Sequence, residues 1–572
     1  MSKNLIYIFK TIVLLLVLNS CKESKIPFAK NQHASRGLIT EKAMVVSARI
    51  EASSIGAEIL KNGGNAFDAM IATELALAVV YPYAGNLGGG GFMVYRMENG
   101  DVGSLDYREK APLAATKNMY LDKDGNIIPG KSTLGGLSVG IPGTIAGMFE
   151  VHEKFGLLPI EDLLNPVIEL ATKGYVVTEK QEKRITGYQA FFRQINKDSI
   201  LYEKKWKKND TIKNLPLAST LKRILLNGKD EFYKGETANV LVKFLQDNGS
   251  IITKEDLIKY KPIWRTPITF NYKDLKIISM PPPSSGGICL AQILKMIEPY
   301  SLNDFGHNSV KMIQVITEAE RRAYADRNYF LGDPDFIEIP IKTLISSAYL
   351  KNRMKDFSFF KATPSSTVSQ GNIEIIESDE TTHYSIIDSY GNAISATTTL
   401  NGAYGSKLYC SELGFFLNNE MDDFSSKVGS PNMFGLIGSE ANSIAPEKRM
   451  LSSMTPTIIE KDGKLFMSVG TPGGSTIITS VLQTILNVYE FNMTMQEAVN
   501  APRFHHQWLP DEIRMEPNSF DEGTIKKLKA LGYFINEKDA PVIGKVDGIL
   551  ILEDGHLEGG ADYRGDDASV GF

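Results

Sequence analysis

The sequence predicts a mixed α/β (α+β) fold in which helices and sheets form layers. Two hairpin signals in the C-terminal part predict a sheet, because each pairs two short β-rich runs across a turn. In the N-terminal part, a long apolar run over residues 66–80 predicts a buried helix. Since strand and helix patterns occur in both halves, neither an all-α nor an all-β architecture fits the chain.

Glycine-rich and proline-rich loops separate the elements expected in the first half. The helix expected at 66–80 is apolar nearly all round, which is typical of a helix buried on every side. The glycine run 88–91 leads into an apolar strand at 92–95. Residues 179–261 are polar and helical, and the loop 281–287 precedes another apolar helix.

The second half carries the two hairpins and a further helix. Residues 382–388 and 393–400 are β-rich and are separated by a turn signal, and 455–460 and 465–469 repeat this arrangement. A helix is expected from about Ser475. Its apolar positions fall at helical spacing: Ile478, Val481, Leu482, Ile485, Leu486 and Tyr489.

Composition limits the classes of function. The 572 residues are 43% hydrophobic, which provides material for a large core and excludes a wholly disordered chain. At about 150 residues per domain, length alone predicts three or four domains. The net charge of −5 gives no basic surface for nucleic acid, so no nucleic-acid partner is expected. Three cysteines are too few for a disulfide framework.

The N-terminus has the pattern of an export signal. Lys3 opens a short basic region, and an apolar stretch ending at Leu18 is too short to span a membrane. Leu18-Asn19-Ser20-Cys21 resembles a bacterial lipobox, which predicts a signal over 1–20, a lipid on Cys21 and a tether over 21–42. The expected location is the periplasm or cell envelope of a bacterium, with the lipid as the only membrane contact. An ordinary secretory signal is the alternative.

Three motifs suggest other chemistries but lack the context for them. The glycine run 88–91 has neither the lysine of a phosphate-binding loop nor dinucleotide spacing, so close backbone packing is favoured. Gly136-Leu137-Ser138-Val139-Gly140 matches a nucleophile elbow, but no clear strand precedes it and Pro142 follows. The adjacent pair His505-His506 lacks the spacing of a zinc site, so a structural role is favoured. No metal or other cofactor is indicated.

Thr381 begins the first hairpin, where threonine alone is explained as a good strand former. Segments elsewhere change this interpretation, since together they closely resemble the γ-glutamyltransferase family (γ-glutamyltranspeptidase, or glutathione hydrolase) of the N-terminal nucleophile hydrolases. The resemblance extends from residue 43 to 572. Its segments are 86–92, 106–112, 325–327, Thr397-Thr398-Thr399-Leu400-Asn401, 417–424, Leu451-Ser452-Ser453-Met454 and Gly470-Thr471-Pro472-Gly473-Gly474-Ser475.

The resemblance implies a self-cleaving proenzyme with a four-layer αββα sandwich built jointly by both chains. Cleavage is expected between Glu380 and Thr381, giving a large chain (43–380) and a small chain (381–572) that form an αβ heterodimer from one precursor. It frees an α-amine with a pKa near 8, which can act as base for the weakly nucleophilic Thr381 hydroxyl. Thr399, on the partner strand, is expected to orient that hydroxyl.

The resemblance also assigns the substrate contacts. Arg108, with Ser452 and Ser453, is expected to bind an α-carboxylate, because a guanidinium grips a carboxylate through two hydrogen bonds. Asn401, Glu420 and Asp423 would accept from the α-ammonium group. Gly473 and Gly474 precede a helix, where free N–H groups suit the oxyanion of a tetrahedral intermediate.

The implied reaction is transfer of the γ-glutamyl group of glutathione or another γ-glutamyl amide to water, an amino acid or a dipeptide. Residues 425–451 resemble the family's lid loop. Phe434 near its tip stands where bacterial relatives commonly have an aromatic residue with a polar group, so one lid hydrogen bond is expected to be missing. Two alternatives remain: a glutaryl-type (cephalosporin) acylase of the same superfamily, and an unprocessed lipoprotein that binds γ-glutamyl compounds or peptides.

Overall fold

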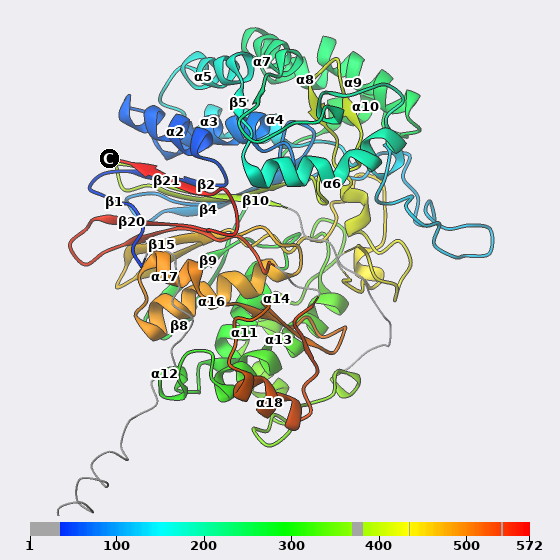
Figure 1. Ribbon diagram of the computed structural model, residues 1–572. Helices are drawn as coiled ribbons and strands as arrows, with labels where there is room; N and C mark the ends of the chain where they lie inside the picture. Colours follow the sequence, from blue (N-terminus) through cyan, green and yellow to red (C-terminus); the bar gives the residue numbers. More distant parts are fainter. Residues whose placement is uncertain (1–34, 369–380, 434, 539–541) are drawn as a thin grey trace, which may run out of the picture. The chain divides into compact units, whose positions relative to one another are not determined.

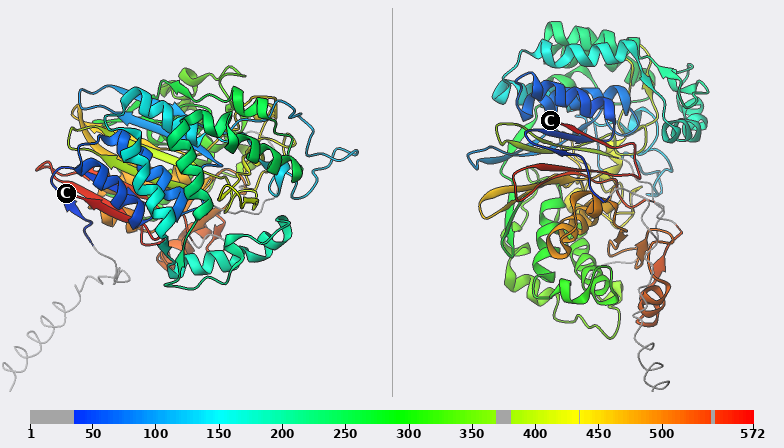
Figure 2. Two further views of the ribbon diagram at one scale, coloured as in Figure 1. Left: turned by 90° about the horizontal axis from the view of Figure 1, so that it is seen from above. Right: turned by 60° about the vertical axis from the view of Figure 1, so that its left-hand side comes forward.

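Two seven-stranded sheets stack face to face, and helices cover the outer surface of each (Figures 1 and 2). They belong to a computed structural model that describes residues 35–368, 381–433, 435–538 and 542–572. Residues 35–572 form one unit. The four-layer αββα sandwich is thereby confirmed, and the three or four domains expected from length are replaced by one shared core.

The first sheet is antiparallel throughout and contains the predicted first hairpin at its centre. Its strands, in spatial order, are β21 (Ala568–Gly571), β2 (Met44–Ser47), β10 (Thr382–Ile387), β11 (Ala393–Thr399), β3 (Gly90–Arg96), β4 (Val102–Asp106) and β7 (Ile263–Arg265).

The second sheet is also antiparallel and contains the predicted second hairpin, β14 and β15. Its spatial order is β1 (Ile39–Thr40), β20 (Leu557–Ala561), β19 (Asp547–Ile551), β15 (Lys464–Gly470), β14 (Thr457–Lys461), β9 (Leu275–Ser279) and β8 (Ile268–Tyr272). Short strands outside the two sheets are β5 (Tyr175–Val176), β6 (Thr211–Ile212), β12 (Tyr409–Cys410), β13 (Phe415–Phe416), β16 (Phe504–His505), β17 (Ile513–Met515) and β18 (Ile535–Asn536).

One helical layer packs outside the first sheet and the other outside the second (Figure 1). The first layer contains α2 (Ile50–Lys61), α3 (Ala66–Val80), α4 (Thr144–Phe155), α5 (Ile160–Lys173), α6 (Glu179–Ile195), α7 (Leu215–Asn227), α8 (Lys229–Tyr233), α9 (Glu236–Asp247) and α10 (Lys254–Lys259). The second contains α11 (Gly286–Ile297), α12 (Leu302–Phe305), α13 (Val310–Phe330), α14 (Ile341–Leu344), α15 (Ser347–Arg353), α16 (Thr476–Phe491), α17 (Met495–Asn500) and α18 (Glu522–Ala530).

The β10–β11 hairpin is buried on both faces because α3 lies on one side and the second sheet on the other. Its turn is fixed by Asp388, whose Oδ1 accepts hydrogen bonds from the backbone N–H groups of Tyr390 and Asn392. Gly391 adopts φ +93°, a conformation in which glycine carries no steric cost. The burial of α3 is complete, as its apolar pattern predicts.

The glycine run before β3 allows a close approach to β11. A Cβ atom at Gly89 would lie 2.1 Å from the carbonyl oxygen of Thr399, and one at Gly91 would lie 2.5 Å from that of Thr397. The expected close backbone packing is thereby confirmed, and β3 begins inside the glycine run rather than after it.

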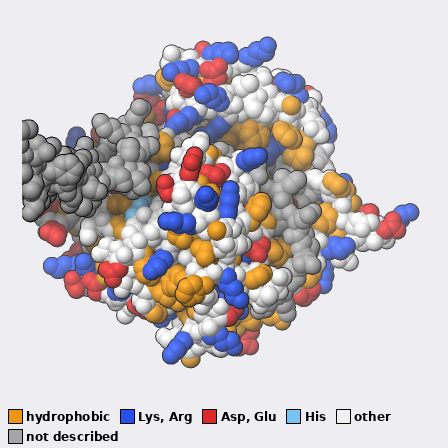
Figure 3. All heavy atoms as spheres, turned by 60° about the horizontal axis from the view of Figure 1, so that its bottom comes forward, with side chains coloured by type: hydrophobic (Ala, Val, Ile, Leu, Met, Phe, Trp, Pro, Cys, Tyr) orange, Lys and Arg blue, Asp and Glu red, His pale blue; other side chains and the backbone are white. Residues whose placement is uncertain are grey.

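The structure bears on the predictions for the N-terminal segment only from residue 35 onward. Residues 1–34, including the signal and Cys21, lie outside the described residues. Ile39–Thr40 pairs with β20, so the sheet begins before residue 42, the predicted end of the tether. Among the helices of the described chain, none is both long and apolar enough to cross a membrane. On the face shown in Figure 3, Lys and Arg side chains are interspersed with Asp and Glu.

Candidate active site

Thr381 lies directly before β10, and Thr399 ends the neighbouring strand β11. The register pairs Thr382 with Thr398, so Thr381 and Thr399 face each other across the open end of the hairpin. Both side chains are almost fully buried, and both line one small cavity. Glu380, the other half of the expected cleavage site, lies outside the described residues.

Most of the predicted site residues line this cavity, although they come from distant parts of the chain. It is lined by Arg108, Arg327, Thr381, Thr399, Asn401, Asp423, Leu436, Ser452, Ser453, Met454, Gly474 and Ile477. Two of the predicted site residues that the structure describes do not line it. Glu420 pairs with the lining residue Arg108, and Gly473 directly precedes the lining residue Gly474. The cavity volume is about 20 Å³, close to the space that one water molecule needs. A γ-glutamyl group therefore requires the site to open.

Arg108 forms two buried ion pairs with the acids predicted to bind an ammonium group. Its Nη1 lies 2.7 Å from Glu420 Oε2 and its Nη2 lies 2.5 Å from Asp423 Oδ2. Glu109 is 3.8 Å away. Burial alone would lower the pKa of Arg108, but the charges of Glu420, Asp423 and Glu109 raise it. The predicted carboxylate clamp is thus paired internally in this structure.

The acids around Arg108 do not all carry a charge at neutral pH. Burial raises the pKa of Glu420 well above its usual range, and it raises the pKa of Glu109 to about 8 against the opposing effect of Arg108. The pKa of Asp423 is also raised by burial. Burial outweighs the attraction of the Arg108 guanidinium at both glutamates, so the direction of these pKa shifts favours a proton on at least one of them.

Asn401 is held in a rare backbone conformation beside Thr399. Its φ is +71°, and its backbone N–H donates to Thr399 Oγ1 at 2.7 Å. Its side-chain Nδ2 donates to the carbonyl oxygen of Asn419 at 3.0 Å. The Asn401 Oδ1 acceptor is thereby oriented, and Thr399 keeps its own hydroxyl proton for another acceptor.

Ser452 and Ser453 lie in a segment that pairs with the loop before α11 through a parallel bridge between Ser284 and Ser452. The backbone N–H and the hydroxyl of Ser285 both donate to the carbonyl oxygen of Ser452, at 2.8 and 2.7 Å. Ser453 Oγ accepts a hydrogen bond from Arg327 Nη2 at 2.9 Å. Both serine side chains line the cavity, as the carboxylate interpretation expects.

Gly473 and Gly474 form the turn before α16, with φ values of +134° and +49°. A Cβ atom at Gly473 would lie 2.4 Å from Thr476 Oγ1, so a side chain there meets a steric conflict. Within the described part of the chain, neither backbone N–H donates to a protein acceptor. These free donors at a helix N-terminus match the predicted oxyanion site.

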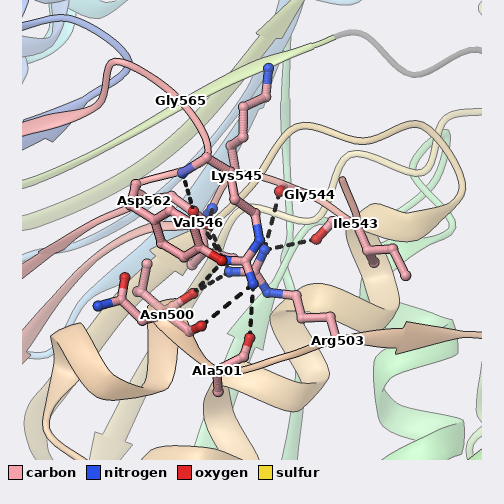
Figure 4. Close-up of polar contacts among 12 residues, drawn as sticks. Asn500, Ala501, Arg503, Ile543, Gly544, Lys545, Val546, Asp562 and Gly565 are labelled. Carbon is pink, nitrogen blue, oxygen red and sulfur yellow. Dashed lines mark hydrogen bonds and ion pairs between the residues drawn. The ribbon is translucent and has the colours of Figure 1, made fainter. Parts of the chain in front are cut away.

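A neighbouring loop supports this turn. The Lys545 N–H donates to Thr471 Oγ1 at 2.8 Å, two residues before Gly473. Arg503 Nη1 donates to the carbonyl oxygens of Ile543 and Gly544. Its Nη2 lies 2.7 Å from Asp562 (Figure 4). Arg503 thus connects α17 to the loop that positions the glycine turn.

The lid loop covers the cavity from the other side. Asn432 Nδ2 donates to Asp423 Oδ1 at 3.0 Å, and the backbone N–H of Met433 donates to Asp422 Oδ2 at 2.8 Å. Leu436 lines the cavity. Phe434, and with it the expected loss of one hydrogen bond, lies outside the described residues. The lid is therefore anchored by the same acidic segment that binds Arg108.

The sequence that matches a nucleophile elbow and the pair His505-His506 both have structural roles. Ser138 lies in a 3-10 helix, and its hydroxyl donates to the carbonyl oxygen of Gly135, so it is not on an elbow between strand and helix. His505 contacts Thr479 and Gln507, and burial lowers its pKa to about 3. His506 packs beside Asp511. No group of three or more metal-ligating side chains occurs among the described residues.

Arg327 is the charged lining residue to which sequence reasoning gave no role. Ala325-Asp326-Arg327 belongs to one of the recognised segments, but an arginine on a helix commonly forms an ion pair with a neighbouring turn. Nothing in the sequence distinguishes that case from an arginine aimed into a site. The cysteines Cys289 and Cys410 are buried free thiols outside the cavity.

Known proteins resemble the chain over nearly its whole length. The family model described as gamma-glutamyltranspeptidase matches residues 52–572. The glutathione hydrolase proenzyme of Escherichia coli strain K12 is 44% identical over 93% of this chain and 92% of its own length.

Two solved structures are also similar. The γ-glutamyltranspeptidase of Helicobacter pylori is 41% identical, with a TM-score of 0.55 over 60% of this chain and 97% of that one. A cephalosporin acylase from Bacillus halodurans is 24% identical, with a TM-score of 0.83 over 95% of this chain and 98% of that one. At that identity, the acylase supports the fold alone.

Proposed function

The chain belongs to the γ-glutamyltranspeptidase family, and from this premise we propose that Thr381 is its nucleophile and that the cavity binds the γ-glutamyl headgroup. The enzyme is a γ-glutamyltransferase and glutathione hydrolase of the N-terminal nucleophile type. Its substrates are glutathione and other γ-glutamyl compounds. The observation that carries the assignment of residues is the convergence of Thr381, Thr399, Arg108 and the Ser452–Ser453 pair on one cavity.

Self-cleavage prepares the nucleophile. Thr381 Oγ attacks the carbonyl carbon of Glu380, the peptide C–N bond breaks, and the proton passes to the released amine. Water then hydrolyses the resulting ester, which leaves a carboxylate on Glu380 and a free hydroxyl on Thr381. The products are a large chain that ends at residue 380 and a small chain (381–572). The new amine has a pKa near 8 and accepts the hydroxyl proton during catalysis.

Transfer takes place in two steps. Thr381 Oγ attacks the γ-carbonyl carbon of the donor, and the amine leaves with a proton, as cysteinylglycine when the donor is glutathione. Water, an amino acid or a dipeptide then attacks the acyl-enzyme and restores the hydroxyl. The negative charge that develops on the carbonyl oxygen in each step is stabilised by the N–H groups of Gly473 and Gly474.

A zwitterionic headgroup fits the paired charges of the closed site. The ion pairs of Arg108 with Glu420 and Asp423 can be replaced by contacts with the α-carboxylate and the α-ammonium of the substrate. Asn401 adds an acceptor for the ammonium, and Ser452 and Ser453 add donors for the carboxylate. The exchange gives the Arg108 guanidinium and the Asp423 carboxylate a new charged partner each, so separating their ion pair leaves neither charge buried alone.

The glutaryl-type acylase is the second candidate, since an acylase shares the fold. Glutaryl substrates lack the α-ammonium and would leave Asp423 without a new partner. The retained acids Glu420 and Asp423 therefore favour an amino-acid headgroup. The N-terminal segment adds a further proposal: a lipoprotein anchored through Cys21 in the periplasm or cell envelope.

The experiment compares wild type with Thr381→Ala on a γ-glutamyl anilide and a glutaryl anilide. The wild type should cleave itself and prefer the γ-glutamyl compound by about 30-fold or more, the usual effect of a lost buried charge contact. Thr381→Ala should remain a single chain without turnover of either anilide. Thr382→Ala, which removes the adjacent hydroxyl, is the matched control and should still be cleaved.

Two results would contradict this proposal. Self-cleavage of Thr381→Ala at residue 380 would exclude Thr381 as the nucleophile. Equal turnover of both anilides by wild type would exclude a site selective for the ammonium group and favour the acylase.

A further inference from the structure

We infer that Arg327 belongs to the subsite for the substrate α-carboxylate, where it supplies the uncompensated positive charge and orients the Ser453 hydroxyl toward the ligand. This inference rests on the proposed function and assigns one more specificity-determining residue to the same site. It begins from the position of Arg327 near the C-terminal end of α13. The residue is 3% exposed and lines the cavity together with Thr381, Arg108 and Ser453.

The protein contacts of Arg327 are all with neutral groups. Its Nε donates to Ser285 Oγ at 2.9 Å, its Nη1 to Asn328 Oδ1 at 3.2 Å, and its Nη2 to Ser453 Oγ at 2.9 Å. No carboxylate lies within ion-pair distance of its guanidinium in the described ranges of the chain. Its neighbour on the same helix, Arg322, pairs with Glu318 and Asp356.

A buried guanidinium without a counter-ion is costly, because the arginine stays protonated and cannot become neutral. Burial lowers the pKa of Arg327, and the electrostatic effects of Cys289, Tyr324 and Asp423 oppose this only in part. The cavity offers space next to the guanidinium, and its other cation, Arg108, is already paired with Glu420 and Asp423. Arg327 is therefore the cation of the cavity with which an entering anion can pair without first separating an existing ion pair.

The hydrogen-bond directions identify where that anion lies. Because Ser453 Oγ accepts from Arg327, its own proton is free to donate toward the cavity. Ser285, the second acceptor of Arg327, donates in turn to the carbonyl oxygen of Ser452. Arg327 thus holds both serines of the predicted carboxylate subsite, directly through one and through Ser285 for the other. The acid that fits this position is the α-carboxylate of the γ-glutamyl donor.

The test uses two donors that differ only in this group. A γ-glutamyl anilide carries the α-carboxylate, whereas a 4-aminobutyryl anilide has the same chain and amine without it. In Arg327→Gln, the ratio of kcat/KM for the two anilides should fall by about 30-fold or more, with most of the loss in KM. In Arg327→Lys, which keeps the charge but cannot reach Ser285 and Ser453 together, the ratio should also fall, but less.

The control is Lys311→Gln, which removes a positive charge from an exposed position of the same helix and should leave the ratio unchanged. The ratio is measured on whichever Arg327 variant is recovered in cleaved form. A ratio within threefold of wild type in that variant would overturn the inference. A folded protein that stays uncleaved in both variants would also overturn it, because Arg327 is assigned to the headgroup and not to the scissile bond.

The outcome is distinguishable from failure of the proposed function. If wild type does not hydrolyse the γ-glutamyl anilide at all, the proposed function fails. If wild type is active and selective but Arg327→Gln keeps the same ratio, only the role of Arg327 fails.

Discussion

Glu74 is a buried carboxyl group that contacts β10, the strand directly after Thr381. It lies on α3, is 1% exposed, and its Oε2 accepts a hydrogen bond from Tyr384 of β10 at 2.8 Å. Burial raises the pKa of Glu74 to about 7, against the smaller effects of its hydrogen bonds with Thr398 and Tyr384. The β10–β11 hairpin is thus in contact with a glutamate of α3 whose pKa lies near neutral pH.

Glu74→Gln should remove a pH dependence of stability. The folded-state pKa lies above the unfolded value, so the stabilisation is complete below about pH 4.5 and is lost as the pH rises through about 7. A shift of this size corresponds to roughly 3 kcal/mol at most. The melting temperature of wild type relative to Glu74→Gln should therefore fall by a few degrees between pH 5 and pH 8. Parallel melting curves at both pH values would contradict the assigned titration.

At the scale of elements, the sequence predicted local structure well and long-range pairing poorly. The first hairpin and α16 begin at or within one residue of their predicted starts, because the turn at 389–392 and the helical spacing after 475 are local signals. The pairing of Arg108 with Asp423 joins residues more than 300 positions apart, and only the folded chain reveals it. The role of Arg327 was not predicted for the same reason, since its contact with Ser453 also joins residues far apart in the chain.

The family resemblance, and not the local pattern, predicted the site residues. Glu420 and Asp423 form a short 3-10 helix whose composition alone also fits a solvated turn. The resemblance predicts which group of the substrate these acids bind. It does not predict whether they are protonated in the closed site, because protonation depends on burial. The lid contacts this segment directly, since Asn432 Nδ2 donates to Asp423 Oδ1 and the Met433 N–H donates to the adjacent Asp422.

The lid should loosen when its contact with Asp423 is removed. Asn432→Ala deletes the hydrogen bond to Asp423 Oδ1 and the one from the Leu436 N–H to Asn432 Oδ1. Of these two bonds, only the one to Asp423 joins the lid to the rest of the site, so at about 1 kcal/mol per net hydrogen bond the open lid should become roughly fivefold more populated. Limited proteolysis should cut residues 425–451 about fivefold faster than in wild type. Ser430→Ala, in the same loop, should leave the rate unchanged. Equal cutting of Asn432→Ala and wild type would contradict the anchoring role.

At the scale of the molecule, both sheets combine strands from either side of residue 380. In the first sheet, β10 and β11 lie between β2 and β3, and β21 extends the sheet beyond β2. In the second sheet, β14, β15, β19 and β20 lie between β1 and β9. The core between the sheets joins Met44 and Val46 to Ile387 and Ile458. The proposed cleavage before Thr381 would therefore cut the chain without dividing the core.

The two chains should remain together after cleavage. In native buffer, size-exclusion chromatography should show both in one peak at the mass of the intact mature protein, and they should separate only in denaturant. This follows because separation would expose strand edges and apolar surface on both sheets. Elution of the small chain by itself under native conditions would contradict the shared core.

N-terminal sequencing of the small chain from purified wild type tests the central claim most directly, since the claim is that self-cleavage makes Thr381 an N-terminal nucleophile. The predicted sequence begins Thr381-Thr382-His383-Tyr384-Ser385. A single uncleaved chain, or a small chain that begins at any other residue, would contradict the claim.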